Sequence, residues 1–117
     1  MTPSVETRQA NEALGLVQSV WETIGAHLEN ARRQVQEEIR HYSPPIPACD
    51  ADFNHLLEER ARIGEELNRM QVAAGKSLSS TDSITLIEEF ILSSNYMTDK
   101  AKHEIRSCLN EMRKMET

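Results

Sequence analysis

Two pairs of residues of the types that bind metal ions flank a proline-rich stretch of the chain. Glu38 and His41 stand three residues apart before it, and Asp52 and His55 repeat that spacing after it. Side chains three residues apart lie on one face of a helix, where some helical bundles use Glu-x-x-His pairs to bind two metal ions. That chemistry also needs further inward-facing glutamates, and none is evident downstream. We therefore expect solvated side chains here, with no bound metal and no other cofactor.

Other side chains that could do catalysis lack activating neighbours. His27 precedes Arg32 and Arg33, but the glycine that a histidine phosphotransfer helix needs downstream is missing. No serine is framed by glycines, and neither Cys49 nor Cys108 has a histidine nearby in the sequence, so no nucleophile has a base beside it. We expect two free thiols, with Cys108 in the core. The sequence predicts no catalytic residue, and we expect a protein that is not an enzyme.

One stretch supports an alternative, enzymatic interpretation. Residues 56–67, LLEERARIGEEL, resemble part of the long helix of the all-helical chorismate mutases. The resemblance implies that Arg60 binds a substrate carboxylate, because a planar guanidinium matches a carboxylate with two parallel hydrogen bonds. The lysine that the family carries three turns later falls at Gln71 here, and Lys76 lies beyond Gly75. A helical-bundle enzyme of this kind, or a metal-binding bundle, is the alternative to a non-enzymatic protein.

The composition disfavours several kinds of partner. The chain has 117 residues, a net charge of −6 and 38% hydrophobic residues. An acidic protein is a poor partner for nucleic acids and anionic membranes, because both carry negative phosphates. No apolar run approaches the roughly 18 residues of a membrane span, and the N-terminal residues do not resemble a signal peptide. We expect a single domain, residues 1–117, in the cytoplasm.

The spacing of apolar residues predicts an all-α fold. Apolar side chains recur every three or four residues from Leu14 to Tyr42, the heptad pattern of a long helix that packs against another helix. Gly25 within it would allow close helix approach. The stretch HYSPPIPACD, residues 41–50, ends this helix, because a residue before proline avoids the helical backbone conformation. We expect helices over residues 4–42, 52–74, 82–94 and 99–115.

The first two helices predict an antiparallel hairpin, which the two short C-terminal helices extend into a three- or four-helix bundle. The second helix is about half as long as the first, so it covers only the half next to the proline corner. Either the C-terminal helices or a second copy of the chain must cover the rest, and the regular heptads favour a second copy. The residues expected to self-associate are Leu14, Val17, Trp21, Ile24 and Leu28.

The proline corner is expected to be a rigid connector, and its tip is a second candidate surface for a protein partner. The tip consists of Pro44, Pro45, Ile46, Pro47 and Cys49. Together these expectations describe a non-enzymatic interaction protein, a homodimer with coiled-coil packing. We expect it to act as an adaptor, a chaperone-like factor or a regulatory subunit. The rival class is a bundle enzyme that uses Arg60, or a metal protein that uses Glu38, His41 and His55.

Overall fold

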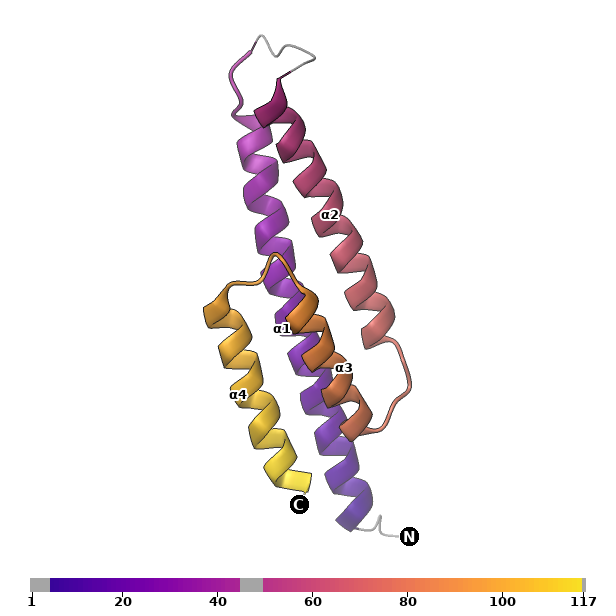
Figure 1. Ribbon diagram of the computed structural model, residues 1–117. Helices are drawn as coiled ribbons and strands as arrows, with labels where there is room; N and C mark the ends of the chain where they lie inside the picture. Colours follow the sequence, from indigo (N-terminus) through magenta and orange to yellow (C-terminus); the bar gives the residue numbers. More distant parts are fainter. Residues whose placement is uncertain (1–4, 45–49, 117) are drawn as a thin grey trace.

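A computed structural model describes residues 5–44 and 50–116, with the side chains of residues 12–44 and 50–114. It shows four α-helices and, over these residues, no strand (Figure 1). The all-α prediction is therefore confirmed, and the observed helix ends lie within two residues of those expected. None of the described helices is long and apolar enough to cross a membrane. The helices are α1 (Val5–Arg40), α2 (Ala51–Ala74), α3 (Ser80–Ser93) and α4 (Asp99–Glu116).

Short polar side chains begin three of these helices. The side chains of Asp50, Ser79 and Thr98 accept hydrogen bonds from the backbone N–H three residues later, at 2.9, 3.2 and 3.1 Å. Each bond satisfies an N–H group that has no partner inside the first helical turn. At the other end of α2, the Gly75 N–H donates to the carbonyl oxygen of Gln71 at 3.1 Å. The local sequence thus fixes where α2, α3 and α4 begin.

The helices pack around α1, which is the longest. α2 runs antiparallel to α1 along the half that ends at the proline corner, and α3 and α4 pack against the other half and against each other (Figure 1). α3 runs in the same direction as α1, and α4 runs in the opposite direction. The molecule measures 68 × 27 × 19 Å. Its radius of gyration is 18.4 Å, against about 13 Å for a compact domain of this length.

The core occupies only the part of the molecule where α3 and α4 lie, which we call the bundle. Buried residues of α1 run from Val17 to Leu28, and those of α2 run from Ile63 to Met70. The rest of the hairpin, residues 29–44 and 50–62, we call the arm. Two helices alone cannot enclose a side chain on every side, so the apolar residues between them are only half-buried: Ala31, Val35, Ile39, Phe53, Leu56 and Leu57.

The end of the arm is fastened by a polar contact. The Tyr42 hydroxyl lies 2.8 and 2.9 Å from the two carboxylate oxygens of Asp50, to which it donates, and the Tyr42 and Phe53 rings pack with centroids 5.1 Å apart. Hydrogen bonds from the Phe53 N–H and then from Tyr42 hold the pKa of Asp50 below its usual value. The same bond to Asp50 raises the pKa of Tyr42. These contacts join the residues just after α1 to the start of α2.

Candidate functional site

Four of the five residues predicted to self-associate are buried within the chain itself. Val17, Trp21, Ile24 and Leu28 have exposed fractions of 6%, 2%, 0% and 0%. α3 and α4 fold back along this half of α1, so they cover the stripe that the heptad pattern assigned to a second copy. Leu14 stays exposed, at 44%. Of the five residues predicted to form a self-association surface, Leu14 is therefore the one that remains exposed.

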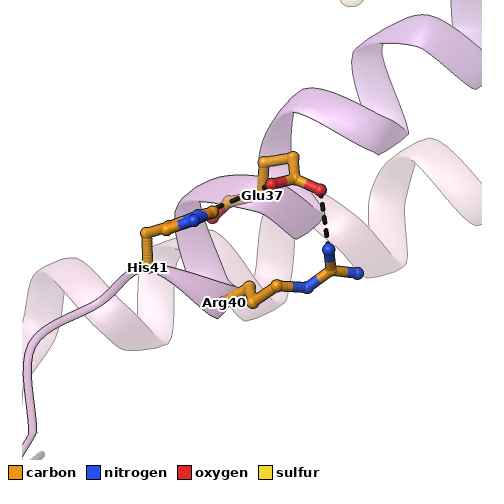
Figure 2. Close-up of polar contacts among 3 residues, drawn as sticks. All are labelled: Glu37, Arg40 and His41. Atoms are coloured by element: carbon orange, nitrogen blue, oxygen red, sulfur yellow. Dashed lines mark hydrogen bonds and ion pairs between the residues drawn. The ribbon is translucent and has the colours of Figure 1, made fainter.

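The carboxylate–histidine pairs beside the corner do not meet. The Nδ1 atom of His41 lies 2.9 Å from the backbone carbonyl oxygen of Glu37, and Arg40 donates to the Glu37 carboxylate at 3.0 Å (Figure 2). His55 contacts a carboxylate four residues along its own helix, at 3.1 Å, and Glu38 is exposed. Over the described residues, no three groups of metal-binding type come together.

The residues of the enzymatic alternative and of the proline tip do not form a site in the described part of the chain. Arg60 is exposed on the arm. Lys76 lies beyond the end of α2, in the connection to α3. Pro44 is exposed. The other tip residues, Pro45, Ile46, Pro47 and Cys49, lie outside the described residues.

The structure buries one acidic residue that the sequence analysis did not single out. Glu66 on α2 is 2% exposed, and its Oε1 atom has no hydrogen-bond partner among the described residues. Tyr96 lies near Glu66. The pKa of Tyr96 is raised above its usual value, and burial is the largest cause. The Arg62 charge opposes this shift, whereas the Glu59 and Glu66 charges add to it. A signal was present in the sequence, because Glu66 follows Ile63 by three positions and so shares its face of α2.

A small cavity lies between α1 and α4. Its volume is about 160 Å³, and Leu16, Val20, Ile105 and Cys108 supply its apolar lining. Cys108 is exposed, so the prediction that it belongs to the core is wrong. It sits at the margin of the buried face of α4, on the side that faces the cavity shared with α1. A cavity of this size holds a molecule about as large as benzene.

A larger opening lies on the opposite side of α1, where α2 ends. Two adjoining cavities of about 440 and 490 Å³ share Gln18, Trp21 and Ala74. Leu14, exposed, stands at one end, and beyond Ala74 no helix continues the line of α2 along α1 (Figure 1). We call this opening the Trp21 groove and define it by Leu14, Gln18, Trp21, Gly25, Met70 and Ala74.

Packing beneath the Trp21 groove fixes its floor. The edge of the Trp21 ring meets the Phe90 ring, with centroids 5.7 Å apart and planes at 79°, and the Arg69 guanidinium lies 5.9 Å from the centre of the Phe90 ring. A Cβ atom at Gly25 would lie 2.9 Å from the Met70 methyl group. The missing side chain of Gly25 therefore leaves room for Met70 between α1 and α2. These contacts restrict the side chains that form the floor.

The rim of the Trp21 groove is electrically neutral. Glu22 and Lys76 are the only charged residues among the described side chains that line it, although the whole chain carries −6. The described lining contains no histidine or cysteine and no pair of acids, and its uncharged polar side chains are those of Gln18, Gln71, Ser77 and Ser83. Comparisons of the chain with models of protein families, with curated proteins and with solved structures find no match.

Proposed function

We propose that this protein is a non-enzymatic interaction protein that binds a helix of a protein partner in the Trp21 groove. The proposal rests on one observation: a groove with a packed floor, lined by apolar residues and by glutamine and serine side chains, lies open beside an exposed leucine. Grooves of this kind bind the apolar face of a helix through side chains spaced three and four residues apart. Such a protein would serve as an adaptor, a chaperone-like factor or a regulatory subunit.

The size of the groove suits a short helical segment. From Leu14 to Gly25, α1 advances about 17 Å, or three helical turns at 1.5 Å per residue. A partner helix of that length presents three or four apolar side chains to the groove. The proposal includes a cytoplasmic location and a homodimeric state, with coiled-coil packing between helices. Its acidic charge favours protein over nucleic acid or anionic membrane as the partner.

Site-specific photo-crosslinking in extracts of the native host tests this proposal. A photoreactive amino acid at Leu14 is expected to give covalent adducts with protein, because this side chain stands at the mouth of the groove. The matched control carries the same group at Leu92, which is 68% exposed on α3 and does not line the groove. Adducts that form at Leu14 and not at Leu92 support the proposal. Equal labelling at the two positions, or none at Leu14, would refute it.

A further inference from the structure

We infer that the cavity between α1 and α4 binds a small ammonium compound with an apolar body, a molecule of the size of protonated benzylamine. This cavity lies on a different side of α1 from the Trp21 groove, and no described residue lines both. The inference therefore goes beyond the proposed function and does not depend on it. It rests on how the cavity arranges its apolar and polar side chains.

The cavity is built from two helix faces that run side by side in opposite directions. On α1, Leu16, Val20 and Thr23 follow one another at spacings of four and three residues, so they form one line along the helix. On α4, Glu104 and Cys108 stand one turn apart on the same face. Because α4 runs opposite to α1, Thr23 and Glu104 lie at one end of the cavity (Figure 1). Leu16 and Cys108 lie at the other end, so the cavity has a polar end and an apolar end.

The floor and the apolar end suit a small hydrocarbon body. Val20 and Ile105 lie between the two ends and are 5% and 4% exposed, so they form a packed floor. The volume of about 160 Å³ is close to that of a cavity of about 150 Å³ that binds benzene. Leu16 and Cys108 are exposed, so the cavity is open to solvent at this end. A ligand can therefore enter without any movement of the helices.

The polar end presents oxygen atoms that accept hydrogen bonds. The Thr23 hydroxyl donates its proton to the backbone carbonyl oxygen of Ser19 at 3.0 Å, so its oxygen is left as an acceptor. The Ser19 hydroxyl also lines the cavity and can accept as well. An ionised Glu104 carboxylate accepts only. An ammonium group has three N–H donors and no acceptor, so it matches this end, whereas an anionic group would meet oxygen atoms of its own sign.

The charges around the cavity favour the same class of ligand. The Glu104 carboxylate has no ion pair or hydrogen bond to another residue in the described part of the chain. No described lysine or arginine lines the cavity, and the whole chain carries −6. A cation is therefore attracted to the polar end, and the Glu104 charge is available to it. For a ligand of this size in a cavity open at one end, we expect a dissociation constant of about 1 mM.

Alkylation of Cys108 by iodoacetamide reports whether the cavity is occupied, because this thiol is exposed and lines the apolar end. The test uses the full chain with Cys49→Ser, which leaves Cys108 as its one thiol. We expect saturating benzylammonium chloride to slow the alkylation by about threefold or more. Benzyl alcohol, a neutral molecule of the same size, should need concentrations about three- to fivefold higher. Alkylation of N-acetylcysteine under the same conditions should not change, which controls for direct effects on the reagent.

Glu104→Gln tests the assignment of an ammonium group. We expect it to weaken benzylammonium binding by about three- to fivefold, to the level of benzyl alcohol. Glu111→Gln is the matched control, because Glu111 is exposed on α4 and does not line the cavity. It removes the same charge and should leave the affinity unchanged. If Glu104→Gln has no effect, or if benzyl alcohol protects Cys108 as well as benzylammonium does, the ligand class is wrong. Unchanged alkylation at about 20-fold above the expected dissociation constant would overturn the inference as a whole.

Discussion

Replacement of Glu66 by methionine is expected to stabilise the protein. Glu66 is 2% exposed, and its Oε1 atom has no hydrogen-bond partner among the described residues. A buried polar group without a partner costs about 1–3 kcal/mol relative to an apolar group of the same shape. Methionine has a similar length and adapts to irregular space. The free energy of unfolding should therefore rise by about 1–3 kcal/mol.

The stabilisation can be measured by thermal and urea unfolding, followed by circular dichroism and by the fluorescence of Trp21. A chain of 117 residues has an unfolding entropy of about 250 cal/mol/K, so each kcal/mol raises the melting temperature by about 4 °C. The expected rise is about 4–12 °C. In urea, the midpoint should increase while the slope of free energy against urea concentration stays constant.

Glu65 supplies the matched control, because it is the neighbouring glutamate on α2 and is exposed. Glu65→Met should change the free energy of unfolding by no more than about 0.5 kcal/mol. Glu66→Gln should recover only part of the gain, because the amide keeps a polar atom in the same place. If Glu66→Met lowers the melting temperature while Glu65→Met does not, the buried carboxylate stabilises the fold and the reasoning fails.

Three further substitutions and one exchange measurement test other parts of the molecule. The carboxylate of Asp50 has a lowered pKa, so its contribution to the free energy of unfolding is present above about pH 4 and is lost as the pH falls below that value. Asp50→Asn should remove this pH dependence from melting curves. Gly64→Ala should stabilise α2 by about 0.5–1 kcal/mol in urea unfolding, because nothing lies within 4 Å of the added Cβ. Gly25→Ala should gain less, because Met70 must move. Amides of α1 beyond Leu28 should exchange with solvent faster than those from Val17 to Leu28, because that part of α1 has no buried side chain.

The positions of the four helices could be predicted because the signals are local. The apolar period along α1, the prolines after Tyr42 and the polar residues before each later helix all act within a few residues of the structure that they determine. Asp50 shows this well, since it directly precedes α2 and its side chain accepts a hydrogen bond from the Phe53 N–H. Such features need no knowledge of how the helices pack.

The identity of the packing partners could not be predicted, because the period says which face is buried and not what buries it. Val17 and Leu28 belong to a stripe that any helix could cover, and the choice between α3, α4 and a second copy depends on the connection after Gly75. Cys108 and Glu66 show the same limit. Each stands at the margin of an apolar face, where the presence or absence of one neighbouring helix decides whether the side chain is buried.

The Trp21 groove follows from a difference in length between two helices. α1 has 36 residues and α2 has 24, so at 1.5 Å per residue α2 leaves about 18 Å of α1 uncovered on its side. α3 and α4 occupy other sides of α1 and bury Val17, but they do not continue the line of α2. If α2 continued past Gly75 for three more turns, it would lie over Leu14 and close the groove. The end of α2 at Gly75 is therefore the feature of the sequence that leaves this face of α1 without a covering helix.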